Sequence, residues 1–250
     1  MKKIYLTVSL FLFLVAFSQE IKVVAAADLR FAFEEIKTEY LKKHPNVSFE
    51  ITYGSSGTAY QKIVNGADYD IFYSADISYP QKLDSLKLTA SKPKVYALGH
   101  LVLWSSNLDV SKGIKVLENP KISTISIANP RHAPYGKRAV ECLKYYHLYD
   151  NLKTKIVEGE NVSQAAQFAL TGNAELGIIA LSLALSPEMQ AKGKFYKIDP
   201  KSYNKLEQAY VLTNNSVKNT AVTDFITFFE SPKAKNILTK YGFGLPLSKK

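Results

Sequence analysis

Tyr53-Gly54-Ser55-Ser56-Gly57-Thr58 stands between two segments of different periodicity. Residues 47–53 alternate apolar and polar side chains as a β-strand does, whereas Tyr60, Ile63 and Val64 follow at helical spacing. The pattern therefore predicts a strand, a tight turn and a helix start. A helix start collects unpaired backbone N–H groups and the positive end of the helix dipole, and serine and threonine add hydroxyl donors. Such a turn is typical of an anion site, although a flexible loop or an ordinary helix cap has the same composition.

The same order of strand, turn and helix recurs along the chain. Strands are predicted at 21–27, 47–53, 69–74, 96–104, 122–128, 155–158, 176–181 and 208–213. Helices follow most of them, and Asp28 is predicted to be the N-cap of the first helix. Four strand-to-helix turns carry small or polar residues: Ala27-Asp28, Ser55-Ser56, Tyr135-Gly136 and Asn161-Val162. This alternation predicts an α/β protein of the doubly wound kind.

The repeated pattern also predicts two α/β lobes joined by a hinge. We expect a discontinuous first lobe at 19–98 plus 212–250 and a second lobe at 99–211, with the chain crossing between them twice. Ligands of open α/β sheets lie beyond the carboxyl ends of the strands. The four polar turns should therefore face one another across a cleft.

The first 18 residues have the features of a cleaved secretory signal peptide. Met1-Lys2-Lys3 is basic, Ile4 to Phe17 is apolar but too short to span a membrane, and cleavage is expected near Ser18. A single cysteine, Cys142, excludes an internal disulfide and favours the periplasm. Loss of two lysines with the signal lowers the formal charge from +10 to +8 (10 − 2), which favours anionic partners. The lysines are scattered and no nucleic-acid-binding motif is present, so nucleic acid is not an expected partner.

Catalytic motifs are absent from the sequence. The Gly54 turn is one residue too short between its glycines for the G-x-S-x-G of a serine hydrolase, and it lacks the Lys of a phosphate-binding P-loop. Four dispersed histidines and one cysteine form no metal-ligand pattern. We therefore expect no enzyme and no cofactor, and an exported hydrolase that uses Ser55 or Ser56 is the weakest alternative. The function class that is left after these exclusions is binding of a small, fully ionised oxyanion by neutral hydrogen-bond donors.

Seven segments, taken together and in order, resemble the periplasmic molybdate-binding proteins of ABC importers. They are residues 24–29, 53–58, 70–76, 128–130 with 133–136, 159–162, 171–177 and 241–243. The resemblance implies the two-lobed type II periplasmic binding protein fold, or Venus flytrap. It also implies a monomer that captures molybdate or tungstate and delivers it to a membrane permease. Binding of another oxyanion, such as sulfate or phosphate, is the alternative.

The resemblance further implies four ligand contacts, at Asp28, Ser56, Tyr135 and Val162. The family commonly has a neutral donor where this chain has Asp28, and a carboxylate would repel a dianion. The Asp28 side chain is therefore expected to cap its own helix, so that only a backbone N–H reaches the ligand. Some members have a tyrosine hydroxyl at the position of Ala180, so that contact should be missing here.

Overall fold

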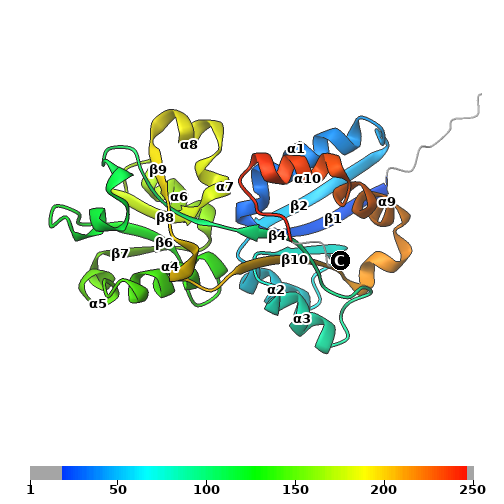
Figure 1. Cartoon of the computed structure of the whole chain (residues 1–250). Helices are drawn as coiled ribbons and strands as arrows, with labels where there is room; N and C mark the ends of the chain where they lie inside the picture. The colour runs from blue at the N-terminus through cyan, green and yellow to red at the C-terminus, as the bar shows by residue number, and fades with distance from the viewer. Residues whose placement is uncertain (1–18, 247–250) are drawn as a thin grey trace, which may run out of the picture.

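A computed structural model describes residues 19–246 as two lobes, each built on a five-stranded mixed sheet (Figure 1). The first lobe contains the N-terminal strands, in blue and cyan, and the C-terminal helices, in orange and red. The second lobe contains the middle of the chain, in green and yellow. The predicted signal peptide at 1–18 lies outside the described residues.

The first sheet has the strand order β2-β1-β3-β10-β4. Its strands are β1 (Gln19–Ala26), β2 (Val47–Gly54), β3 (Ile71–Ser74), β4 (Lys94–Gly99) and β10 (Leu206–Leu212). β1 runs parallel to β2 and β3, whereas β10 runs antiparallel to β3 and to β4. The carboxyl ends of the three parallel strands therefore meet at one edge of this sheet.

The second sheet repeats this arrangement in the order β7-β6-β8-β5-β9. Its strands are β5 (Leu101–Ser105), β6 (Ile125–Ala128), β7 (Ile156–Gly159), β8 (Leu176–Ala180) and β9 (Lys194–Lys197). β6 is parallel to β7 and β8, and β5 is antiparallel to both β8 and β9. The two-lobed α/β architecture predicted from the sequence is confirmed.

Helices connect the strands of both sheets. The first lobe has α1 (Arg30–Leu41), α2 (Ser56–Val64), α3 (Ser78–Ser85), α9 (Thr220–Phe229) and α10 (Pro232–Lys240). The second has α4 (Pro134–Tyr145), α5 (Tyr149–Leu152), α6 (Val162–Leu170), α7 (Leu181–Ala184) and α8 (Pro187–Lys192). Short 3-10 helices lie at Ala27–Leu29, Val110–Glu118, Lys153–Lys155, Pro200–Ser202 and Asn214–Lys218. Within residues 19–246, every helix is too short or too polar to cross a membrane.

Apolar packing is continuous from one lobe to the other. The first lobe has an aromatic core in which Phe33 packs against Tyr73 and Phe225. Small residues of this lobe at the cleft, Ala26 and Ala75, belong to the same apolar cluster as the core of the second lobe. Because these residues have almost no side chain, the two lobes approach closely at the strand ends.

The chain crosses between the lobes at two points. The apolar run at 96–104 is not the single strand predicted, because β4 and β5 lie in different sheets with His100 between them. The second crossing precedes Leu206, since all of β10 pairs within the first sheet. By sheet membership the division therefore falls before β10, and not at 211/212. A continuous apolar run does not reveal where the pairing partner changes, which is why the sequence pattern missed both features.

Candidate oxyanion site

A small cavity lies between the lobes at the carboxyl ends of the parallel strands. It is lined by Ala26, Ala27, Asp28, Gly54, Ser55, Ser56 and Ala75 of the first lobe and by Ala133, Pro134, Tyr135 and Val162 of the second. Its volume is about 10 Å³, the scale of one water-sized sphere, so a ligand larger than water needs the lobes to move apart. All four residues predicted as ligand contacts line this one cavity.

The start of α2 presents one N–H and one hydroxyl to the cavity. The N-cap Ser55 accepts the N–H of Thr58, and the N–H of Gly57 is bonded to the carbonyl of His132 across the cleft at 2.9 Å. The N–H of Ser56 has no intrahelical acceptor and is left over. The Ser56 hydroxyl is completely buried and accepts the N–H of Ala75 at 2.9 Å, which leaves its proton to donate.

The start of α6 follows the same rule. The Asn161 side chain accepts the N–H groups of Ser163 and Gln164, at 3.0 and 3.1 Å. The N–H of Val162, at the first helical position, is therefore the one that the cap does not use. The Asn161 side chain thus shapes this turn.

The start of α4 has no side-chain cap among the described residues. Pro134 occupies its first position and has no N–H, so the N–H of Tyr135 is the first one available. The next residue is Gly136, and only glycine fits there because the helix start packs against the end of β6. An added Cβ would lie 1.9 Å from the carbonyl oxygen of Ala128. Three helix starts thus converge, each with its positive dipole end and an uncommitted N–H.

The Asp28 side chain differs from its prediction as a helix cap. Asp28 lies inside the 3-10 helix Ala27–Leu29, which is preceded by Ala26 and has no side-chain cap. The carboxyl is buried, and its Oδ2 accepts the hydroxyl of Tyr135 at 2.9 Å and the side-chain amide of Gln208. The carboxylate does not cap because these two donors, on a helix of the other lobe and on β10, hold it.

A buried polar network continues from Asp28 towards the crossing strands. The Gln208 amide oxygen accepts the Tyr96 hydroxyl at 2.6 Å, and its nitrogen also donates to the Tyr135 hydroxyl at 3.2 Å. Burial raises the pKa of both tyrosine hydroxyls well above the usual value, so they remain neutral donors. Gln208 and Tyr96 are not recognisable as site residues from the sequence pattern, because their contacts join parts of the chain more than 70 residues apart.

Two further contacts join the lobes at the rim of the cleft. The Ser55 hydroxyl lies 2.9 Å from Nδ1 of His132. Arg138 of α4 makes an ion pair with Asp76 of the first lobe at 3.1 Å, and both side chains are largely buried. These contacts stabilise the arrangement in which the lobes enclose the cavity.

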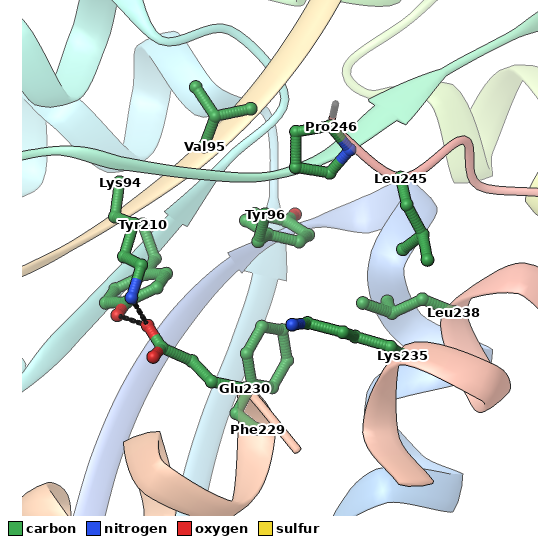
Figure 2. A pocket seen from close by; sticks show the side chains of 10 residues that line it. All are labelled: Lys94, Val95, Tyr96, Tyr210, Phe229, Glu230, Lys235, Leu238, Leu245 and Pro246. Carbon is green, nitrogen blue, oxygen red and sulfur yellow. Dashed lines mark hydrogen bonds and ion pairs between the residues drawn. The ribbon is translucent and has the colours of Figure 1, made fainter. Parts of the chain in front are cut away.

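A second cavity, of about 290 Å³, lies in the first lobe among β4, β10, α9, α10 and the C-terminal segment (Figure 2). Its wall is aromatic, with Tyr96, Tyr210 and Phe229. The carboxylate of Glu230 is already engaged by Lys94 and by the Tyr210 hydroxyl. This cavity has none of the converging helix starts of the first one.

Comparisons with known proteins agree with this geometry. Residues 21–244 match the family described as bacterial extracellular solute-binding protein. The chain is 33% identical over 228 residues to the molybdate-binding protein ModA of Azotobacter vinelandii, covering 90% of each. It is 31% identical over 227 residues to ModA of Rhodobacter capsulatus, covering 90% of this chain and 88% of that protein.

Solved structures show the same fold. The periplasmic molybdate-binding protein of Azotobacter vinelandii matches with a TM-score of 0.85 and 32% identity, over 90% of this chain and 99% of that one. The sulfate-binding protein SubI of Mycobacterium tuberculosis matches with a TM-score of 0.74 and 16% identity, over 92% of this chain and 88% of that one. The predicted two-lobed periplasmic binding protein fold is confirmed, and the chain belongs to the family of bacterial extracellular solute-binding proteins.

Proposed function

We propose that the protein is the solute-binding component of an ABC importer, which captures molybdate or tungstate in the periplasm and delivers it to the membrane permease. The observation that carries this proposal is the convergence of the three helix starts on one small cavity between the lobes. Each supplies an N–H without a described acceptor, from Ser56, Tyr135 and Val162, and Ser56 adds a hydroxyl.

The chemistry of the cavity suits a small dianion. No lysine or arginine is among the residues that line it, so recognition relies on dipoles and neutral donors. A hydrogen bond to a charged group contributes about 1.5–3 kcal/mol, and several such bonds together give tight binding. Ser56, Tyr135 and Val162 are the proposed donors, and Asp28 is the fourth contact.

The relatives support the choice of ligand. The two relatives reported above by sequence are molybdate-binding proteins, and each aligns with 90% of this chain. An importer component acts by binding, so we propose a monomer without catalytic activity or cofactor. Closure of the lobes around the anion would give the permease a distinct state to recognise.

Sulfate or phosphate is the second ligand class, favoured by the similarity of the fold to a sulfate-binding protein. Isothermal titration of the mature protein with molybdate, tungstate, sulfate and phosphate separates the two. One-to-one binding of molybdate and tungstate, with weak or absent sulfate binding, is the expected result. Preference for sulfate or phosphate would leave the fold assignment intact and contradict the proposed ligand. Absence of binding to all four anions would overturn the proposed function.

The pair formed by Ser55 and His132 is the observation that would favour a hydrolase. Ser55, however, also caps α2 through the N–H of Thr58 and bonds to its hydroxyl at 2.8 Å. In the part of the chain that the structure describes, no carboxylate is hydrogen-bonded to His132 to orient it. We therefore expect no labelling by a serine-directed phosphonate, and labelling at Ser55 would contradict a purely binding role.

A further inference from the structure

Asp28 is the only residue with an acidic or basic side chain among those that line the oxyanion cavity. It is 1% exposed, and none of the ion pairs among the described residues includes it. If it stayed ionised, its negative charge would lie at the site of an anion. Two negative charges that share one buried site repel each other, and such sites commonly retain a proton.

The two oxygens of the Asp28 carboxyl differ in their surroundings. Oδ2 accepts hydrogen bonds from Tyr135 and from Gln208. A flip of the Gln208 amide would break a hydrogen bond, because its oxygen already accepts the hydroxyl of Tyr96. Oδ1 is buried and has no hydrogen-bond partner within residues 19–246. A proton on the carboxyl would therefore be placed on Oδ1, and Oδ2 would keep its two donors.

The groups that surround Asp28 are neutral. From α4 and β4 the titratable groups that face it are the hydroxyls of Tyr135 and Tyr96, whose raised pKa values keep them protonated. β10 contributes the amide of Gln208, and α7 contributes Ser182, whose hydroxyl donates to the Asp28 carbonyl at 2.8 Å. Among the described residues, no lysine or arginine makes an ion pair or a hydrogen bond with the Asp28 carboxyl.

Burial raises the pKa of Asp28 to about 6 before any ligand is considered. The hydrogen bonds from Gln208 and Tyr135, and then the backbone N–H groups of Asp28 and Leu29, offset part of that effect. A dianion in the cavity would raise this pKa further, because it penalises the ionised carboxylate. A pKa of about 6 leaves Asp28 mostly ionised in the free protein at neutral pH, and a bound dianion would favour the neutral acid.

Building on the proposed function, we propose that Asp28 takes up one proton from solvent when the oxyanion binds and then acts as a neutral hydrogen-bond donor through Oδ1. The O–H bond forms at Oδ1, and the anion keeps its own charge. A buried carboxylic acid that donates a hydrogen bond to an anionic group is a known way to use aspartate in an apolar site. This residue would thus replace the neutral donor expected at its position.

Titration of the mature protein with molybdate at pH 6, 7 and 8, each in two buffers of different ionisation enthalpy, measures the proton uptake directly. With a free pKa of about 6, uptake should be about one half at pH 6 and approach one at pH 8. The affinity should fall up to about tenfold between pH 7 and 8. Binding of molybdate without proton uptake overturns this inference alone. Absence of binding to molybdate, tungstate, sulfate and phosphate overturns the proposed function as well.

Two variants locate the proton. Asp28→Asn keeps a donor without the charge, so its binding should take up no proton, should lose the pH dependence, and should exceed wild-type affinity at pH 8 by about tenfold or more. Ser56→Ala should bind more weakly at every pH and still take up the proton. Persistent pH dependence in Asp28→Asn would assign the proton to the ligand, and loss of binding in a folded Asp28→Asn would show that the carboxylate acts as an acceptor; either result overturns the inference.

Discussion

Replacement of Ser56 by alanine is the most direct test of the proposed hydrogen-bond donors to the anion. The Ser56 hydroxyl oxygen both accepts a hydrogen bond within the protein and carries the proton proposed to bind the anion. The Ser56 hydroxyl accepts the N–H of Ala75 at 2.9 Å and has its own proton free for the anion. The side chain is completely buried, so water cannot replace it without reorganisation. The substitution therefore affects binding through the lost O–H and affects stability through the lost acceptor.

The two effects have different expected sizes. Loss of a hydrogen bond to a charged ligand costs about 1.5–3 kcal/mol, which corresponds to a roughly 10- to 150-fold weaker affinity for molybdate. The Ala75 N–H, in a residue that is 1% exposed, loses its acceptor, and this lowers the free energy of unfolding by about 1–3 kcal/mol. Isothermal titration measures the first quantity and urea unfolding without ligand measures the second.

Ser105→Ala is the matched control. Ser105 is 1% exposed at the end of β5 and does not line the oxyanion cavity. Its hydroxyl donates to the Glu175 carbonyl at 2.6 Å and accepts the N–H groups of Asn107 and Leu108. This variant should lose stability but keep wild-type affinity. If Ser56→Ala also bound molybdate with wild-type affinity while losing stability, the hydroxyl would serve only Ala75, and the donor argument would be refuted.

Three further predictions concern the frame of the site. Gly136→Ala should abolish binding and lower the melting temperature, because its Cβ would lie 1.9 Å from the Ala128 carbonyl; unchanged binding would show that the start of α4 is dispensable. Asp76→Asn should weaken binding about 3- to 10-fold at low salt, since it breaks the ion pair with Arg138 across the cleft, and a salt-independent effect would argue against that cause. Cys142 is completely buried, with a pKa raised to about 11, so a thiol reagent at pH 8 should label it only as fast as the protein unfolds; rapid labelling of the folded protein would contradict this.

The sequence was sufficient to predict the helix starts that surround the cavity. Ser56, Tyr135 and Val162 follow strands whose periodicity is clear, and the rule that ligands lie beyond strand ends brings such turns together. The structure places them around one cavity, and their contact with the anion remains a prediction. Helix capping by Ser55 and Asn161 also depends only on neighbouring residues, so it can be predicted from the sequence in the same way.

The surroundings of Asp28 could not be predicted in the same way. Its partners Tyr135 and Gln208 lie 107 and 180 residues away, and no periodicity links such distant positions. Local reasoning assigned the carboxylate to the nearest free N–H groups, as a cap. Burial and two donors from elsewhere in the fold gave it a different environment, which only the tertiary structure reveals.

The division of N–H groups at the helix starts has a consequence for engineering. In α6 the Asn161 cap consumes the second and third N–H groups. In α2 the Ser55 cap takes the third, and the His132 carbonyl takes the second, that of Gly57. The number of donors that a ligand meets is therefore set by these acceptors more than by the lining side chains. Most lining residues are alanine, glycine or proline and offer little to redesign. A new ligand preference would therefore be obtained by changing the separation of three helix axes, or by removing a cap to add donors, and not by exchanging side chains within the pocket.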